Sequence, residues 1–435
     1  MVQRLDSSDS GFKGAFDALV TARGEAAEDV EDLVSDIIAD VRARGDAALL
    51  DYTAKFDGFQ AENTAALAVG ADRIKVSRAA CSNQQIAALE LAAARIEDYH
   101  HRQLPDDVDY TDQDGIRLGA RYTAIEAVGL YVPGGTAAYP SSVLMNAVPA
   151  RVAGVSRMVM AVPAPGGELN PLVLAAASIA GIEEIHRIGG AQAVAALAYG
   201  TDTIRPVDKI VGPGNAYVAC AKRRVFGTVG IDTIAGPSEV LVVADAGNDP
   251  AWIAADLMSQ AEHDADAQAV LITDDGTFAD AVTAAVENCL AGMSRADIAR
   301  CSWHDFGAVI VVDTLANAAP LIDRLAPEHL QLAVADPDAL AGAVRNAGAI
   351  FLGRHMPEAL GDYVAGPSHV LPTSRSARFS SGLGVMDFLK RTSFMGCDEA
   401  GLARIGPAAQ ELAGAEGLDA HALSVSLRLD KHENK

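Results

Sequence analysis

Several side chains in this sequence belong to types that can move protons between a protein and a substrate. Glu328 and His329 follow Pro327 and precede an apolar run that predicts a strand, so the two neighbouring side chains point in different directions. A histidine has an unperturbed pKa of about 6.5 and can act as a base near neutral pH. The pair therefore favours acid–base work, although a solvated loop glutamate and histidine is the usual interpretation of such a pair alone.

A second group has residue types that can hold a metal ion. Gln260 and His263 lie three residues apart in a segment that predicts a helix, so they share one face, and Asp264 and Asp266 follow closely. Glutamine is an uncommon zinc ligand beside His, Cys, Asp and Glu. Spacing alone therefore favours a helix-surface histidine, unless distant histidine or aspartate residues converge on it.

Further polar residues gather near the end of the chain. Asp362 and His369 lie in a segment rich in glycine and proline, and Glu416 and His421 flank the start of a predicted final helix. Each of these residues taken alone is more often structural than catalytic.

Glycine-rich turns indicate where a ligand would approach the backbone. Four of them come at the predicted carboxyl ends of parallel strands, the edge at which open α/β sheets bind ligands. They are Tyr131–Gly135, Ile188–Gly190, Val211–Asn215 and Ala235–Glu239. The G-x-G-x-x-G fingerprint is missing, because Tyr217 stands where its third glycine belongs, and there is no Walker A loop. Ordinary turn chemistry remains the alternative.

These residues need elements to position them, and the pattern after residue 124 predicts alternating strands and helices. The predicted strands are Ala127–Val132, Met158–Val162, Glu184–Ile188, Lys209–Val211, Val240–Ala244, Ala269–Thr273, Ala308–Val312, Leu330–Val334 and Ala349–Leu352. The predicted helices between them include Ser141–Gly154, Pro171–Ala180, Ala191–Tyr199, Asn215–Phe226 and Pro250–His263. Such alternation is typical of crossover connections, so we expect an α/β fold with two doubly wound, mainly parallel sheets.

The ends of the chain show other patterns. Apolar residues from Val30 to Val41 follow helical spacing, Gly45 is a plausible stop, and a second helix is expected over residues 83–101. Residues 105–114 are polar and acidic, which indicates a connector. After Gly366 the pattern is irregular until a helical stretch over residues 418–427.

Composition narrows the class of protein. The chain has 435 residues, which suggests two or three compact units, and half of them are hydrophobic. A formal charge of −24 disfavours nucleic acid and membrane surfaces as partners. The five cysteines are far apart and form no C-x-x-C pair. We find no secretory signal and no membrane-length apolar run, so we expect a cytoplasmic enzyme.

Taken together, the motifs resemble those of the histidinol dehydrogenase family, in the same order and over about residues 25–428. The matching segments are Val128–Gly135, Gly189–Gln192, Val211–Tyr217, Ala235–Glu239, Ser259–Asp264, Ala326–Leu330, Gly361–Tyr363, His369–Thr373 and Glu416–His421. One departure is minor: Ser368 stands where the family has asparagine, while Asp362 and His369 are present.

The resemblance implies zinc- and NAD-dependent, four-electron oxidation of L-histidinol to L-histidine through L-histidinaldehyde. It implies that His329 is the base that acts in both steps and that Glu328 activates water for the second. The remaining roles carried over by position are zinc ligands at Gln260, His263, Asp362 and His421; NAD contacts at Tyr131, Gln192 and Asn215; and substrate contacts at Ser238, His329, Glu416 and the zinc ligands. Whether His369 contacts substrate or only braces its loop stays open.

The resemblance also implies a homodimer of two incomplete Rossmann-like lobes. The expected parts are an arm at residues 1–25, a first lobe at 26–128 plus 239–378 with the zinc and catalytic residues, an inserted NAD-binding lobe at 129–238, and an extension at 379–435. The helical extension would be swapped between subunits, so that Glu416 and His421 complete the neighbour's site.

Two other functions fit parts of the pattern. One is a related zinc and NAD dehydrogenase that oxidises another small alcohol, such as a sulfopropanediol, for which a more basic pocket would be expected. The other is a zinc hydrolase in which Glu328 activates a metal-bound water, and it would turn over without NAD.

Overall fold

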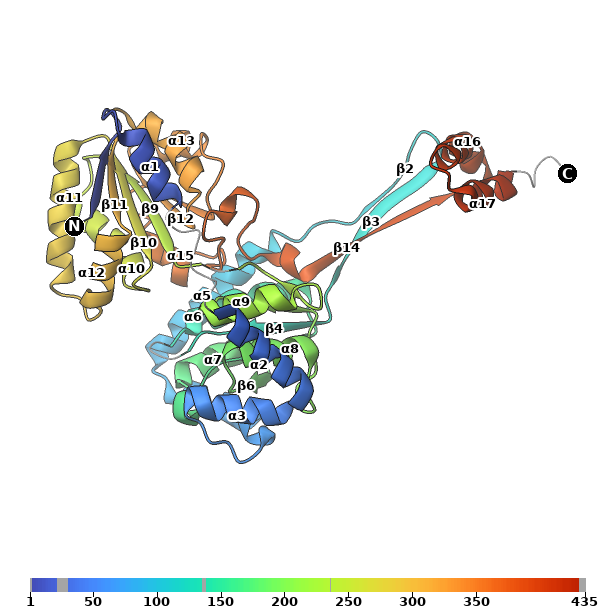
Figure 1. The fold of residues 1–435 in the computed structure, drawn as a ribbon, viewed down its shortest axis with the longest axis horizontal. Helices are drawn as coiled ribbons and strands as arrows, with labels where there is room; N and C mark the ends of the chain where they lie inside the picture. Colours follow the sequence, from blue (N-terminus) through green and yellow to red (C-terminus); the bar gives the residue numbers. More distant parts are fainter. Residues whose placement is uncertain (1, 22–29, 135–137, 235, 430–435) are drawn as a thin grey trace. The chain divides into compact units, whose positions relative to one another are not determined.

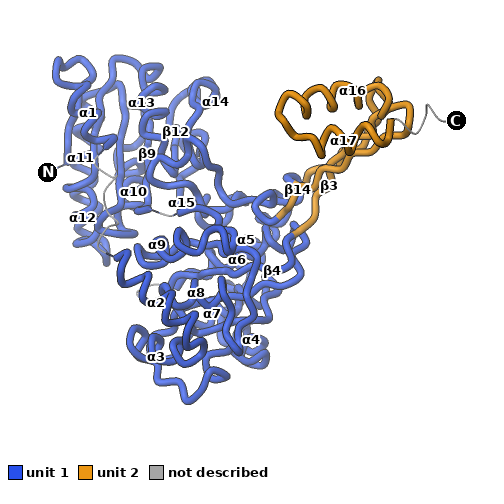
Figure 2. Tube along the Cα trace, turned by 45° about the vertical axis from the view of Figure 1, so that its right-hand side comes forward, with its two compact units in different colours: residues 1–103, 125–388 blue, residues 104–124, 389–435 orange. Residues whose placement is uncertain are grey.

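The computed structural model describes residues 2–21, 30–134, 138–234 and 236–429, and these form an α/β fold (Figure 1). The expected fold class, with mainly parallel sheets, is confirmed. The chain divides into two compact units. The first contains residues 1–103 and 125–388, and the second contains residues 104–124 and 389–435 (Figure 2).

A six-stranded parallel sheet forms one half of the first unit. In spatial order its strands are β1 (Gln3–Asp6), β11 (Ala308–Val311), β10 (Gln268–Thr273), β9 (Glu239–Ala244), β12 (His329–Ala333) and β13 (Ala349–Leu352). The helices of this half are α1 (Phe12–Thr21), α10 (Pro250–Ala261), α11 (Gly276–Leu290), α12 (Ala296–Asp305), α13 (Ala318–Leu325), α14 (Pro337–Ala341) and α15 (Glu358–Tyr363).

Alternating side chains of the central strands explain why helices cover both faces of this sheet. Leu241 and Val243 of β9 pack with apolar residues of α1 and α13. Val240 and Val242 point to the opposite face and pack with α10, α11 and α12. Because every residue of β9 is buried, each apolar side chain contributes about 1.5–3 kcal/mol of transfer free energy to folding.

A five-stranded parallel sheet forms the other half of the first unit. Its strands, in spatial order, are β6 (Glu184–His186), β5 (Arg157–Ala161), β4 (Ala127–Tyr131), β7 (Lys209–Val211) and β8 (Gly230–Ile231). The helices of this half are α2 (Glu31–Arg44), α3 (Asp46–Asp57), α4 (Ala71–Ser77), α5 (Asn83–His101), α6 (Pro140–Ala153), α7 (Pro171–Ala180), α8 (Gly190–Tyr199) and α9 (Ala216–Val225).

The N-terminal helix predicted from apolar spacing is confirmed as α2, and Gly45 ends it with a positive φ of 54°. Its stripe is narrower than expected, because Leu33 is 43% exposed while Val34 and Val41 are buried. Helix α2 packs against α8 and α9, beside the five-stranded sheet. The predicted domain bounds stay a prediction, and residues 22–25 of the predicted arm lie outside the described residues.

The second unit corrects two expectations. The acidic segment read as a connector contains β2 (Val108–Thr111), which pairs with β3 (Ile116–Ala124). The segment expected to be irregular contains β14 (Leu389–Cys397), antiparallel to β3 along its whole length, and α16 (Glu399–Ala415). The predicted final helix is confirmed as α17 (Asp419–Leu429). The strands were missed because their mostly exposed residues show no apolar alternation.

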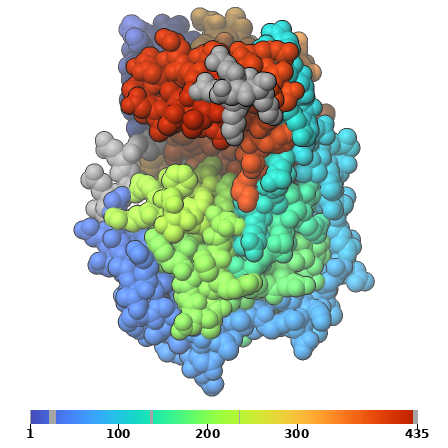
Figure 3. Space-filling model, turned by 90° about the vertical axis from the view of Figure 1, so that its right-hand side faces the viewer, coloured from blue at the N-terminus to red at the C-terminus, as the bar shows by residue number. Residues whose placement is uncertain are grey.

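The two C-terminal helices present apolar side chains at their surface, and Figure 3 shows that surface in red. Leu412, Leu423 and Leu427 are each more than half exposed. Among the described residues, no helix combines the length and apolar character needed to span a lipid bilayer.

Candidate active site

His329 lies at the first position of β12, where the strand enters the six-stranded sheet. Its side chain is buried, and Nδ1 lies 2.9 Å from the main-chain oxygen of Glu239. Because a carbonyl oxygen only accepts hydrogen bonds, Nδ1 carries the proton, and the neutral ring presents its lone pair at Nε2. Burial lowers the pKa of His329, which favours this neutral form over the imidazolium despite the opposing charge of Asp362.

Glu328 and Glu239 hold each other in place at the same edge of the sheet. The main-chain N–H of Glu239 donates to the Glu328 carboxylate at 2.9 Å, and the main-chain N–H of Glu328 donates to the Glu239 carboxylate at 3.2 Å. Burial raises the pKa of Glu328 well above its ordinary value, and the neighbouring acids add to the effect. A carboxylate with a raised pKa is a better proton acceptor in catalysis than one exposed to water.

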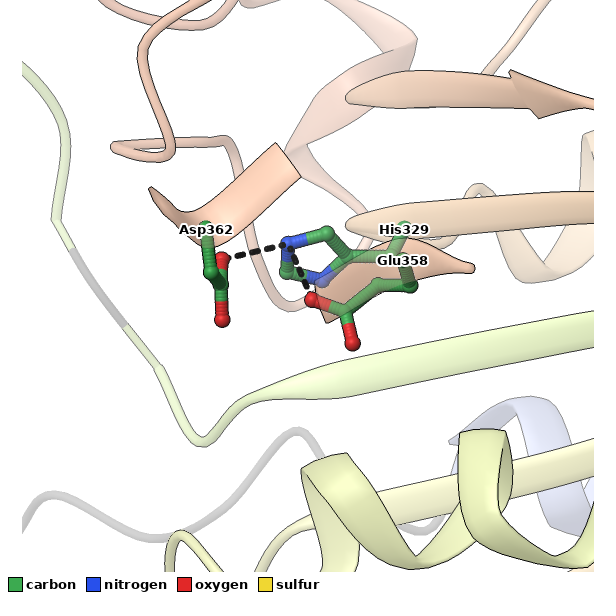
Figure 4. Close-up of side chains that lie close together, drawn as sticks. All are labelled: His329, Glu358 and Asp362. Carbon is green, nitrogen blue, oxygen red and sulfur yellow. Dashed lines mark ion pairs between the residues drawn. The ribbon is translucent and has the colours of Figure 1, made fainter. Parts of the chain in front are cut away.

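Glu358 and Asp362 face the free nitrogen of His329 from α15 (Figure 4). His329 Nε2 lies 3.6 Å from a carboxylate oxygen of Glu358 and 3.8 Å from one of Asp362. Burial and the proximity of Glu358 raise the pKa of Asp362 to about 7. One ligand atom from each of the three residues lies within 4.8 Å of the others, so the group can hold a divalent cation.

Sequence reasoning missed Glu358. It is 1% exposed, and its carboxylate accepts a hydrogen bond from Ser259 Oγ at 3.0 Å and interacts with Gln260 and Asp362. Its place four residues before Asp362 was the available signal, because residues with this spacing share one helix face. That signal depended on knowing that this proline-flanked segment is helical.

Gln260 lies in the last turn of α10, and His263 is the second residue after the helix ends. Gln260 is 1% exposed; its amide faces the Glu358 carboxylate and lowers the pKa of that group, while its amide oxygen has no hydrogen-bond partner among the described residues. Unpaired buried amide atoms cost free energy, so they indicate a missing ligand. The side chain of His263 is accessible to solvent. The surrounding protein nevertheless lowers the pKa of His263, and repulsion from the His329 ring lowers it further, which indicates that His263 lies near the cluster.

His369 is held between two parts of the first unit. Its Nδ1 lies 3.0 Å from the main-chain oxygen of Asp362, and its Nε2 lies 3.1 Å from Ser142 Oγ of α6. Burial lowers its pKa to about 4, so the ring stays neutral at physiological pH. These contacts support a role in bracing the end of α15, which carries Asp362.

The three residues expected to contact NAD lie at the carboxyl ends of strands in the five-stranded sheet. Tyr131 ends β4, and its hydroxyl accepts a hydrogen bond from the main-chain N–H of Gly190 at 3.0 Å. Gln192, in α8, is 1% exposed, and its amide oxygen has no hydrogen-bond partner among residues 2–21, 30–134, 138–234 and 236–429. Asn215 caps α9 by accepting a hydrogen bond from Val218 N at 3.2 Å. Backbone N–H groups at a helix start suit a phosphate ligand.

Comparison with known proteins agrees with this geometry. The family model described as histidinol dehydrogenase matches residues 21–429. A protein named histidinol dehydrogenase from Rhodospirillum rubrum is 63% identical over 432 residues, covering 99% of each chain. Another from Rhizobium meliloti is 63% identical over 433 residues and covers the full length of both chains. The crystal structure of histidinol dehydrogenase from Elizabethkingia anophelis superposes with a TM-score of 0.94 at 36% identity, covering 99% of this chain and 98% of that one.

The chain belongs to the histidinol dehydrogenase family. It is therefore an enzyme of the oxidoreductase class. In the first unit the structure brings the expected residues Glu328, His329 and Asp362 together, and it adds Glu239 and Glu358. Gln260 lies against Glu358 and His263 lies near His329, but His263 is outside the group whose ligand atoms are within 4.8 Å of one another, which is His329, Glu358 and Asp362.

Three further residues expected from the family resemblance are Glu416, His421 and Ser238. Glu416 caps the end of α16 and His421 lies in α17, and both are exposed side chains of the second unit, so their part in the site stays a prediction. Ser238 immediately precedes β9, and its main-chain oxygen accepts a hydrogen bond from Gln268 N at 2.9 Å. Gly135 and Ala235, at the ends of two family motifs, lie outside the described residues.

The last glycine-rich turn connects the two sheets. It follows β8, a parallel strand at the edge of the five-stranded sheet, and its residues 236–238 lead into the amino end of β9. The acid–base cluster lies at the amino ends of β9 and β12, whereas the turns at Tyr131, Gly190 and Gly212 lie at carboxyl ends of strands in the five-stranded sheet.

Proposed function

We propose that the protein oxidises L-histidinol to L-histidine through L-histidinaldehyde, with zinc as its metal and two molecules of NAD as oxidant. The observation that carries the proposal is the buried base: His329 Nε2 presents a lone pair beside two carboxylates and has no hydrogen-bond partner in the part of the chain that the structure describes. Membership of the family supports histidinol as the alcohol.

The residues present fit a zinc ion. Gln260, His263 and Asp362 would hold it, and the unpaired buried amide oxygen of Gln260 is the specific support for this donor set. Zinc, when bound, would be chelated by the imidazole and amino nitrogens of the substrate, which would fix the reacting carbon. Glu358, at 3.6 Å from His329, borders this donor set and would orient it.

The residues at the carboxyl edge of the five-stranded sheet fit a dinucleotide. Gln192 has a buried amide oxygen that no described residue partners, and Gly212 allows the backbone to pass close to Tyr131. NAD, when bound, would accept the hydride from the substrate carbon in each step.

The acid–base steps follow from the protonation of the two catalytic residues. His329 accepts the hydroxyl proton at Nε2 as the alcohol is oxidised, and again as the hydrated aldehyde is oxidised. Glu328, with its raised pKa, accepts a proton from the water that adds to the aldehyde. General-base catalysis of this kind contributes about 10²–10⁴-fold to each rate.

The proposed assembly is a homodimer in which Glu416 and His421 of one subunit complete the site of its neighbour. Two features of the second unit support it: both side chains are exposed, and apolar residues such as Leu412 and Leu423 lie uncovered on the same two helices. His421 would supply the fourth zinc ligand, and Glu416 would accept a hydrogen bond from the substrate imidazole.

The experiment that tests the proposal measures NADH released per histidine formed from L-histidinol by the zinc-loaded protein. Two NADH are expected, with histidine confirmed by mass spectrometry, and chelation should abolish turnover until Zn²⁺ is restored. One NADH per substrate, or oxidation of a sulfonated propanediol in preference to histidinol, would overturn the substrate assignment. Turnover without NAD would instead indicate hydrolase chemistry.

A further inference from the structure

A buried ion pair lies beside the turn that precedes α9. Lys222 of α9 and Asp232, which follows β8, form an ion pair in which each side chain is only 2% exposed. The residues are ten apart in sequence, and no residue of the acid–base cluster contributes to the pair. Neither residue was singled out from the sequence, and the mechanism above gives neither a role.

Both members of the pair form hydrogen bonds with the main chain of Gly212. Lys222 Nζ donates to the main-chain oxygen of Gly212 at 2.9 Å. The carboxylate of Asp232 accepts from the main-chain N–H of Gly212 at 2.7 Å. The pair therefore satisfies the donor and the acceptor of one peptide position, in a turn where β7 has ended and no strand partner is available.

Gly212 is where the proposed dinucleotide site is most constrained. Its φ is +110°, and a Cβ there would lie 2.1 Å from the main-chain oxygen of Tyr131. Three residues later Asn215 begins α9 as its cap. On the other side, the Tyr131 hydroxyl accepts from Gly190, whose Cβ position lies 2.8 Å from the unpaired oxygen of Gln192. A shift of Gly212 would thus move Asn215 relative to Tyr131 and Gln192.

We propose that Lys222 and Asp232 are positioning residues for the dinucleotide: they hold the Gly212–Asn215 turn so that the start of α9 and Asn215 meet the cofactor. The inference rests on the proposed use of NAD. The physical reason is that a buried ion pair is a poor source of stability compared with apolar side chains of similar size. The core around the pair consists largely of alanine and valine side chains, so burying the two charges costs desolvation free energy. We therefore explain the presence of the pair by the position in which it holds the Gly212–Asn215 turn.

The test compares NADH binding by the zinc-loaded wild type and by the double variant Lys222→Met/Asp232→Val, followed by nicotinamide fluorescence. Removing both charges avoids leaving one of them buried and unpaired. The NADH dissociation constant is expected to rise about 10- to 100-fold, the range seen when outer-shell partners of ligand-holding groups are removed. The KM for NAD should rise in parallel, while kcat at saturating NAD and the KM for histidinol stay near wild type.

A matched control keeps the result specific. Arg157, the first residue of β5, and Glu184, the first residue of β6, form a partly buried ion pair. These strands are neighbours in the same sheet, and the pair lies away from the turn. The variant Arg157→Met/Glu184→Gln is expected to lower the melting temperature and leave the NADH dissociation constant unchanged. An equal loss of NADH affinity in this control would show a general effect of lobe stability and overturn the proposal.

The remaining outcomes are also decisive. If the folded Lys222/Asp232 double variant binds NADH as tightly as wild type, the pair does not position the site. If the double variant does not fold, Asp232→Asn serves instead, because it keeps an oxygen for Gly212 N–H but loses the charge that holds Lys222, and NADH affinity must still fall. If the wild type shows no saturable NADH binding, the proposed use of NAD fails, and with it this role for the pair.

Discussion

Glu239 and Glu328 exchange hydrogen bonds, each carboxylate accepting from the other's main-chain N–H, at 2.9 and 3.2 Å. The same Glu239 offers its main-chain oxygen to His329 Nδ1 at 2.9 Å. One residue at the start of β9 therefore orients the Glu328 carboxylate and sets the tautomer of His329 at the start of β12. The register of these two neighbouring strands, in which His329 pairs with Val240, brings the three residues together.

The first prediction concerns Glu239. Glu239→Leu removes the acceptor for the main-chain N–H of buried Glu328, and an unpaired buried donor costs about 1–3 kcal/mol. We expect a fall in the free energy of unfolding of roughly that size, measured by urea denaturation, together with a lower kcat. Glu239→Gln retains one acceptor oxygen and should lose less of both. Identical losses in the two variants would contradict this account.

The second prediction separates the roles of the catalytic pair. His329→Asn is expected to lose alcohol and aldehyde oxidation alike, because the base acts in both steps. Glu328→Gln should mainly slow aldehyde oxidation, by about 10²-fold or more, because only that step consumes water. The measurement is NADH formation with histidinol and, separately, with histidinaldehyde. Equal slowing of both steps in Glu328→Gln would refute the division.

The third prediction concerns Glu358, the residue that only the structure identified. Glu358→Gln keeps the size and the contact with Ser259 but removes the negative charge that faces His329 and Asp362. We expect zinc affinity to fall about 10- to 100-fold, as for other partners of metal ligands. Zinc per subunit after dialysis against a competing chelator measures this, with the remote surface variant Glu287→Gln as the control. Unchanged zinc retention would remove Glu358 from the metal site.

The fourth prediction tests the shared site. His329→Asn and His421→Asn are each expected to be nearly inactive as pure proteins. When the two are unfolded together and refolded in equal amounts, a swapped dimer leaves one intact site in each mixed dimer, so about a quarter of wild-type activity should return. No recovery, in a mixture shown to contain mixed dimers, would mean that each subunit completes its own site.

The fifth prediction concerns stability against pH. His100 in α5 is fully buried, and its Nδ1 donates to the main-chain oxygen of Ile96 at 2.7 Å. Burial lowers the pKa of His100 below the value of 6.5 that applies when the chain is unfolded, so the unfolded chain binds the proton more tightly. Its contribution to stability is complete above about pH 6.5 and decreases as the pH falls below that value.

The variant His100→Gln should therefore lose less stability than wild type when the pH is lowered from 7.5 to 5, measured as the change in urea midpoint. His101→Gln is a suitable control, because His101 is its exposed neighbour. An equal pH dependence in wild type and His100→Gln would show that His100 does not titrate in this range.

Local sequence patterns determined much of the fold. The fully buried valine and isoleucine runs of β9 and β10 and the apolar stripe of α2 were predicted correctly, because these periodicities reflect which side chains lose water within one element. The family motifs likewise pointed to Glu328, His329, Asp362, Gln260 and His263. Each of these is a chemically distinctive side chain in a recognisable local context.

The tertiary structure decided the relationships between distant parts of the chain. Strands β3 and β14 are separated by more than two hundred residues and pair mainly through their backbones, so side-chain patterning did not reveal them. Glu358 became visible only when α15 brought it opposite His329. The tautomer of His329 depends on the carbonyl of Glu239, ninety residues away. Such contacts depend on how the strands and helices pack, and the local sequence of one segment does not show which distant segments will pack against it.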